Sequence, residues 1–141
     1  MEKACVVFLV AFVILSCSSP LHAAHPTEFQ GSVAPQFTHI SSVVARLSIS
    51  AWGEASCTGS VTLYSNLHTA TLVMELQRFS GSTWTTVQSW TSSGPGFPGV
   101  YMNRAHWVVR GTYRLRCIAR AFSGSGVLLE EVTVLSHEVG Y

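Results

Sequence analysis

Aspartate is absent from this chain and Lys3 is its only lysine, so almost all of its charge comes from seven arginines and seven glutamates. Charged residues make up only 11% of the 141 residues, and the formal net charge at pH 7 is +1. The strong basicity that marks general nucleic-acid binding is missing. A near-zero charge also gives no long-range attraction to anionic membranes. The composition therefore disfavours both kinds of partner.

Catalytic and metal-binding motifs are missing as well. The chain has no Gly-x-Ser-x-Gly nucleophile elbow, and Ser123–Gly126 is better explained as a turn. Glu130 and Glu131 are adjacent, so on a strand their carboxylates would point to opposite faces rather than form a hydrolase pair. The histidines lack the short spacing of ligand pairs, apart from His22 and His25 near the N-terminus. We predict no enzyme, no cofactor and no metal site.

The one long apolar run, Ala4–Leu15, has 12 residues, well short of the roughly 20 needed to span a bilayer. It follows Lys3 and precedes small residues at Ala23 and Ala24, which predicts a signal peptide over residues 1–23. The protein is thus expected to be secreted, with no transmembrane segment in the mature chain. Cys17 follows Leu15 and Ser16 in an arrangement similar to a bacterial lipobox, and a lipid there is the alternative.

Apolar residues at helical spacing are missing after the leader, which disfavours α/β folds. Residues 24–41 contain scattered Pro and Gly and predict an extended arm. Over residues 42–141, short runs alternate between apolar and polar residues and are separated by turn residues. The expected strands cover residues 43–51, 57–65, 70–79, 84–91, 100–109, 112–122 and 127–136. This pattern predicts an all-β domain, a single antiparallel β-sandwich of about seven strands.

Two of the four cysteines, Cys5 and Cys17, belong to the predicted leader, which leaves Cys57 and Cys117. A pair of cysteines in an exported chain indicates a disulfide, worth about 4 kcal/mol for so long a loop. The alternatives are two buried free thiols or a metal site, and a metal site needs more ligands than two distant cysteines supply. We predict the Cys57–Cys117 disulfide.

Several motifs carry a resemblance to known domains. Cys57 on the second expected strand and Cys117 on the sixth, with Tyr113 before it, resemble an immunoglobulin-like domain. Gly111–Arg116 looks like the sixth strand of fibronectin type III domains, with Tyr113 as the tyrosine corner. This resemblance implies an immunoglobulin-like order in which the third, fourth, sixth and seventh strands share one sheet.

A second resemblance covers about residues 42–134. Leu47–Ser50, Ala55–Val61, Leu76–Arg78 and Trp84–Trp90 resemble segments of a group of uncharacterised small exported proteins of Gram-positive bacteria. The resemblance implies bacterial export but no particular activity, because one sandwich architecture serves many functions.

The sequence also predicts a candidate binding face. If Tyr113 and Cys117 point inward, the arginines of residues 112–122 lie together on the outer face. Arginine suits phosphate or carboxylate groups, and an open aromatic ring suits a sugar or a protein. The alternatives are a solvated face with Arg–Glu cross-strand pairs, and tryptophans that face inward. The candidate residues are Arg114, Arg116, Arg120, Glu75, Gln77, Trp84 and Trp90.

A second candidate is the Gly- and Pro-rich loop Ser92–Gly99, with Phe97, Tyr101 and Met102 nearby. Its apolar residues could contact a partner, but we predict that they fold back as a lid over one end of the sandwich.

Taken together, the sequence predicts a secreted, non-enzymatic β-sandwich that binds at or outside the cell surface. The expected partners are a cell-surface glycan, a wall polymer or a protein. The alternatives are a structural or assembly protein that pairs through exposed edge strands, and a small secreted effector or bacteriocin-like protein.

Overall fold

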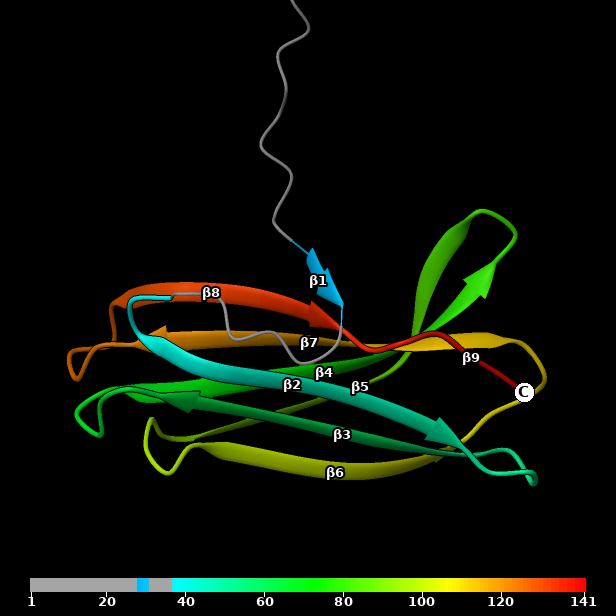
Figure 1. The fold of residues 1–141 in the computed structure, drawn as a ribbon, viewed down its shortest axis with the longest axis horizontal. Helices are drawn as coiled ribbons and strands as arrows, with labels where there is room; N and C mark the ends of the chain where they lie inside the picture. Colours follow the sequence, from blue (N-terminus) through cyan, green and yellow to red (C-terminus); the bar gives the residue numbers. More distant parts are fainter. Residues whose placement is uncertain (1–27, 31–36) are drawn as a thin grey trace, which may run out of the picture.

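The computed structural model of the chain describes residues 28–30 and 37–141. These residues form two β-sheets that pack face to face as a sandwich (Figure 1). The described part of the chain contains no helix, and so none with the length and apolar character to cross a membrane. The predicted signal peptide and the alternative lipid site at Cys17 lie outside the described residues.

The larger sheet has the strand order β1-β8-β7-β4-β5, with β9 paired to β7. The smaller sheet has the order β2-β3-β6. All pairs are antiparallel except β1 with β8. The strands are β1 (Glu28–Gln30), β2 (Ile40–Ile49), β3 (Glu54–Leu63), β4 (Thr69–Ser80), β5 (Thr83–Pro95), β6 (Val100–Trp107), β7 (Thr112–Phe122), β8 (Leu128–Leu135) and β9 (Val139–Gly140).

The all-β sandwich predicted from the sequence is confirmed. The third, fourth, sixth and seventh expected strands are β4, β5, β7 and β8, and they share the larger sheet as expected. Tyr113 is buried, and its hydroxyl donates a hydrogen bond of 2.7 Å to the carbonyl oxygen of Val109. This bond ties β7 to the turn before it, as a tyrosine corner does.

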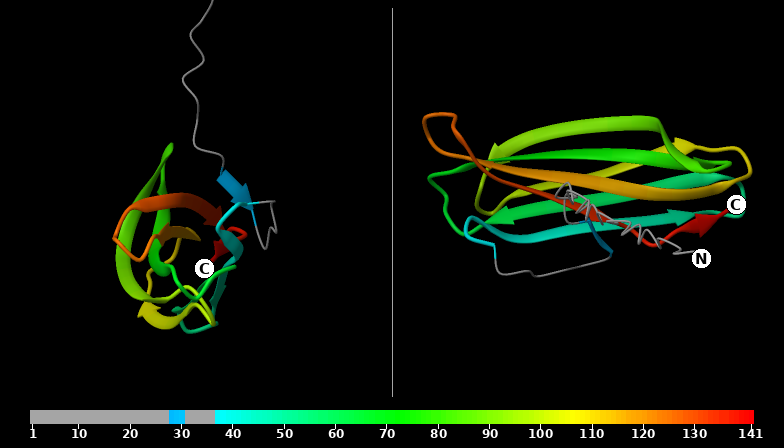
Figure 2. Two further views of the ribbon diagram at one scale, coloured as in Figure 1. Left: turned by 90° about the vertical axis from the view of Figure 1, so that its left-hand side faces the viewer. Right: turned by 90° about the horizontal axis from the view of Figure 1, so that it is seen from above.

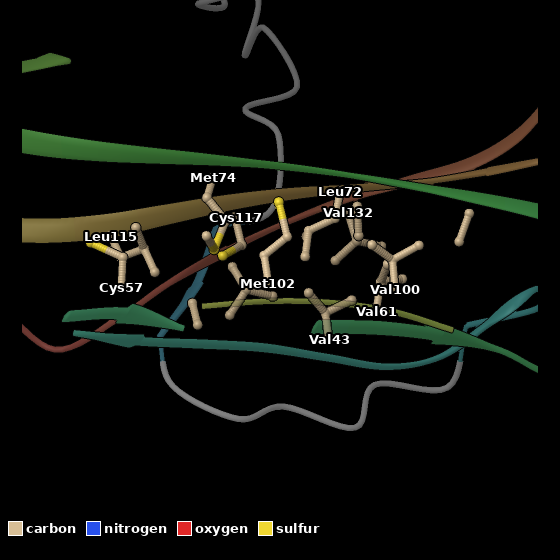
Figure 3. Close-up of a cluster of buried hydrophobic side chains, with 14 of the residues drawn as sticks. Val43, Cys57, Val61, Leu72, Met74, Val100, Met102, Leu115, Cys117 and Val132 are labelled. Atoms are coloured by element: carbon tan, nitrogen blue, oxygen red, sulfur yellow. The ribbon is translucent and has the colours of Figure 1, made fainter. Parts of the chain in front are cut away.

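Alternating side chains fill the space between the sheets because every second residue of a strand points inward. The inward residues predicted for β3, β4 and β7 are buried, and Figure 3 shows part of this core. In β2 the prediction extends too far. Leu47 and Ile49 are only partly buried against the core, and Ala51 is exposed because it lies in the turn that follows.

Gly59 on β3 occupies an inward position that a larger residue could not fill. A Cβ atom at Gly59 would lie 2.6 Å from the Met74 sulfur and 3.0 Å from the Cys117 sulfur. The missing side chain therefore makes room for two sulfur-containing side chains that reach across from the larger sheet.

The N-terminal region is attached to the larger sheet at two points. Glu28–Gln30, part of the predicted arm, pairs with Thr133–Leu135 of β8. Farther along, one oxygen of the Glu130 carboxylate accepts bonds of 2.8 Å from the backbone N–H groups of His39 and Ile40. Its other oxygen accepts a bond of 3.2 Å from Thr38. The start of β2 is thus fastened to β8.

Seen from above in Figure 2, the strands of both sheets run along the same long axis. The connections therefore gather at two opposite ends of the molecule. We call the end that carries the β3–β4, β5–β6 and β7–β8 connections the loop end (Figure 1). The opposite end carries the β2–β3 and β6–β7 turns and the tip of the β4–β5 hairpin.

Candidate functional site

The predicted arginine face exists on the outer side of the larger sheet. Arg114, Arg116 and Arg120 alternate along β7 with residues whose side chains face the core. The register places Glu75 of β4 opposite Arg116, and Gln77 opposite Arg114. On the other side of β7, Glu131 of β8 is opposite Arg120. Cross-strand neighbours on one face interact directly, so this register decides the partner of each guanidinium.

Each arginine on this face has a partner within the protein. Arg116 forms an ion pair with Glu75, with 3.3 Å between the guanidinium nitrogen and the carboxylate oxygen. Arg120 forms an ion pair with Glu131. Arg114 donates a bond of 2.9 Å to the side-chain oxygen of Gln77, which is itself buried although it lies on the outer side of the sheet.

The aromatic part of the predicted site is divided. Trp84 lies on the arginine face, where the Arg114 guanidinium stacks 4.3 Å from the centre of its ring. The Phe79 ring contacts Trp84 as well, with 5.2 Å between the ring centres. Trp90 instead packs against the core and meets the His106 ring at 6.4 Å. The prediction that both tryptophans flank the arginines is therefore wrong for Trp90.

A β-bulge explains the division. Leu76 pairs with Gln88 and Gln77 pairs with Thr86, so Val87 has no partner on β4. One extra residue inverts the alternation, because side chains on a strand change face at every step. Trp84 and Thr86 therefore share the outer face with Gln77, whereas Gln88 and Trp90 share the inner face with Leu76 and Met74.

These contacts change the interpretation of the arginine face. Both of its ion pairs join neighbouring strands, and the ring of Trp84 is covered by Arg114 and Phe79. Cross-strand Arg–Glu pairs of this kind are typical of a solvated sheet surface. The sequence left open the alternative of a solvated face with Arg–Glu cross-strand pairs. The geometry fits this alternative better than it fits an open anion-binding site.

The loop end has a different character. The predicted loop Ser92–Gly99 is shorter than expected, because β5 continues to Pro95 and pairs with β4 up to Thr69. Phe97 is 61% exposed and Tyr101 is 66% exposed, whereas Met102 is buried. The prediction that these residues form a lid is therefore wrong for Phe97 and Tyr101.

Hydrogen bonds hold two loops of this end together. Gly96 donates from its backbone N–H to the His68 carbonyl at 2.8 Å and accepts from the Leu63 N–H at 2.7 Å. A Cβ atom at Gly96 would lie 2.6 Å from the Ser65 carbonyl oxygen, so only glycine fits this contact. The third loop is adjacent, because a Cβ atom at Gly124 would lie 3.5 Å from the Leu67 carbonyl oxygen.

Each loop presents a large apolar side chain to solvent. Leu67 is 79% exposed, and Val127 of the β7–β8 connection is 59% exposed, comparable with Phe97. The connections themselves, residues 64–68, 96–99 and 123–127, contain no Arg, Lys, Asp or Glu. Exposed apolar side chains gathered on neighbouring loops are typical of an interaction surface. Phe97 was part of the second candidate predicted from the sequence, but the sequence did not indicate that the three loops lie close together.

The predicted disulfide between Cys57 and Cys117 is not present in the structure. Both cysteines are buried free thiols. The Cys117 sulfur lies over Gly59, one inward position beyond Cys57 on β3, and Figure 3 shows the two sulfur atoms apart. Successive inward positions are about 7 Å apart along a strand, which exceeds the Cβ separation that a disulfide bridges.

Burial also makes these thiols unreactive. It raises the pKa of Cys57 from 9.0 to about 12. Burial, together with the nearby Cys57, raises the pKa of Cys117 to about 12 as well. The thiolate is the nucleophile and metal ligand of cysteine, so neither residue is suited to such chemistry at neutral pH. Among the described residues, no three His, Cys, Asp or Glu side chains come together as metal ligands.

Comparison of the chain with protein-family models, curated proteins and solved structures finds no match.

Proposed function

We propose that this protein is an exported, non-enzymatic binding module that contacts its partner at or outside the cell surface through the loop end. The predicted leader and the resemblance to exported bacterial proteins support export. The strand order and the Tyr113 hydrogen bond support an immunoglobulin-like sandwich as its framework. Sandwich domains of this kind commonly bind through loops gathered at one end.

The observation that carries the proposal is the uncharged apolar tip formed by Leu67, Phe97 and Val127. All three side chains are more than half exposed. The Gly96 hydrogen bonds join the loops that carry Leu67 and Phe97, and the loop that carries Val127 is adjacent. Anchoring apolar groups on a rigid framework lowers the entropic cost of binding, because little of the surface has to be ordered. A partner with an apolar pocket or patch would fit this tip.

The test is binding of the purified, labelled protein to intact cells and isolated envelopes of its host, measured by co-sedimentation. The double variant Leu67→Ser/Phe97→Ser should bind at least about tenfold more weakly, because anchor residues of an interface commonly contribute 1 to 2 kcal/mol or more each. Unchanged binding by this variant would refute the proposal.

The matched control is Trp52→Ser/Val109→Ser, which removes exposed apolar side chains from the opposite end of the sandwich. We expect this variant to bind as the parent does. Equal losses in both double variants would indicate non-specific hydrophobic adhesion and would also contradict the proposal.

A second candidate function, assembly through an edge strand, is favoured by β5. This strand is 13 residues long, forms the edge of the larger sheet and carries no charged side chain. Natural proteins usually protect long edge strands with charges, so an uncharged edge favours pairing with another strand.

Sedimentation velocity over a hundredfold range of protein concentration separates the candidates. A binding module stays monomeric, whereas an assembly protein shifts to larger species, and Thr91→Lys at the edge should then reverse the shift.

A further inference from the structure

A cavity with a volume of about 480 Å³ lies beside the smaller sheet. It borders β2, the edge strand of that sheet, and reaches the segment that follows β8. Neither the predicted arginine face nor the loop end contributes to it. Its lining residues are Ala45, Arg46, Leu47, Ser48, Ser56, Thr58, Ser136 and His137.

The side chains that give the cavity its chemistry come from the outer face of the smaller sheet. Arg46 of β2 is opposite Thr58 of β3, and Ser48 is opposite Ser56. Cross-strand partners point to the same face. One guanidinium and three hydroxyl groups therefore lie side by side, at positions 46 and 48 of β2 and 56 and 58 of β3. His137 adds an exposed imidazole from beyond β8.

Arg46 differs from the other arginines of the described chain. Four of those have a hydrogen bond or ion pair on the larger sheet or at its end. Arg104 donates to the Asn103 carbonyl, and Arg110 stacks on the Tyr141 ring. Among the arginines of the described residues, Arg46 alone has no side-chain hydrogen bond, ion pair or ring contact, and it is exposed.

The hydroxyl groups are available too. Ser48, Ser56 and Thr58 form no side-chain hydrogen bond with any described residue. Ser136 differs, because its hydroxyl accepts from the Leu115 N–H and donates to the His137 carbonyl. Among the described residues, no carboxylate lines the cavity. These residues thus offer one positive charge and several free hydrogen-bonding groups to an anion.

We propose that this cavity binds an anionic saccharide, with Arg46 holding its phosphate or carboxylate and the Ser48, Ser56 and Thr58 hydroxyls contacting the sugar hydroxyls. Guanidinium groups pair with oxyanions through two parallel hydrogen bonds. Hydroxyl side chains both donate and accept, which matches the hydroxyl groups of a sugar. A volume of about 480 Å³ accommodates one or two sugar rings.

The experiment is titration of the isotopically labelled full chain, followed by amide chemical shifts. The probes are glucose 6-phosphate, glucuronate, glucose and inorganic phosphate. We expect glucose 6-phosphate or glucuronate to shift the amides of Ser48, Ser56 and Thr58, and the stronger of the two identifies the preferred oxyanion. Glucose and phosphate alone should bind at least about tenfold more weakly, since each offers half of the contacts.

Arg46→Gln should weaken binding of the preferred probe by about tenfold to a hundredfold, the range for a charge-assisted hydrogen bond. Arg104→Gln, an exposed arginine on β6, is the matched control and should leave binding unchanged. The proposal fails if neither sugar acid binds, if glucose or phosphate binds as well as the sugar acids, or if both variants weaken binding equally. Leu67→Ser/Phe97→Ser should retain this binding, so the outcome is separate from the function proposed for the loop end.

Discussion

Strands β3 and β5 are both long and rich in Ser and Thr, but they behave differently in the fold. Every β3 residue from Ala55 to Leu63 pairs with β2, and burial alternates without interruption. On β5 the unpaired Val87 divides the strand, so Trp84 lies on the outer face of the sheet and Trp90 faces the core. Alternation therefore predicts the faces of a strand only when each residue has a partner.

Deletion of Val87 should have the largest effect on this difference. Without the extra residue, one half of β5 must turn over, which either exposes Trp90 or buries Trp84 and Thr86. We expect a loss of about 4 kcal/mol in the free energy of unfolding, comparable with removing a packed tryptophan. Urea denaturation measures it. Val87→Thr keeps the bulge and should cost less than about 1 kcal/mol. Equal stability of the deletion variant and the parent would contradict the assignment of the bulge.

The two tryptophans give the next test. Trp90→Ala should lower the free energy of unfolding by about 3 kcal/mol, because its side chain packs against the core. Trp84→Ala should cost only about 1 kcal/mol, the sum of a cation–π contact with Arg114 and a ring contact with Phe79. Thermal melts of both variants suffice. A larger loss for Trp84→Ala than for Trp90→Ala would mean that the segment of β5 before Val87, and not the segment after it, faces the core.

On β3 the corresponding test is Gly59→Ala. The added methyl group would overlap the Met74 sulfur, and we expect a loss of about 2 kcal/mol from overpacking. Gly94→Ala on β5 is the matched strand variant, since its Cβ would approach the Val100 side chain at an ordinary 3.4 Å. It should change stability by less than about 0.5 kcal/mol. Similar losses in the two variants would show that the β3 position is not closely packed.

The smallest effect concerns the two buried thiols. The Cys117 sulfur faces Gly59 rather than Cys57, so both cysteines remain free. The native protein at pH 8 should react very slowly with iodoacetamide, because a pKa of about 12 leaves almost no thiolate. After unfolding without a reductant, both Cys57 and Cys117 should be alkylated, and the intact mass of protein that lacks the predicted leader, and with it Cys5 and Cys17, should rise by two groups. Alkylation that requires reduction would instead demonstrate the disulfide predicted from the sequence.

Much of the core was predictable because β3, β4 and β7 alternate regularly between turn residues. The strand grouping and Tyr113 followed from the resemblance to immunoglobulin-like domains. The bulge was not predictable, because Trp84 and Trp90 are an even number of residues apart and the regular alternation of an unbroken strand would place both on one face. Gly59 was a usable indication, since a glycine at an inward position implies close approach from the facing sheet.

The candidate site was predicted less well. The sequence correctly placed Arg114, Arg116 and Arg120 on one face, but it did not indicate that Arg46 is the arginine without a partner. Which arginine has a carboxylate opposite it depends on register, and register is set by pairing between distant segments. The disulfide prediction failed for a related reason. The number of cysteines does not show how far Cys117 on β7 is displaced along the sandwich from Cys57 on β3, in the facing sheet.

The parallel pairing of β1 with β8 has a mechanical consequence. Tension between the chain preceding β1 and the chain following β8 draws these two strands in opposite directions along their common axis. The hydrogen bonds between Glu28–Gln30 and Thr133–Leu135 then carry the force together, in shear, whereas an antiparallel pair pulled from one end opens bond by bond. Once β9 has been detached from β7, a single-molecule pulling trace should therefore show one abrupt rupture at this short pairing, before the sandwich itself extends.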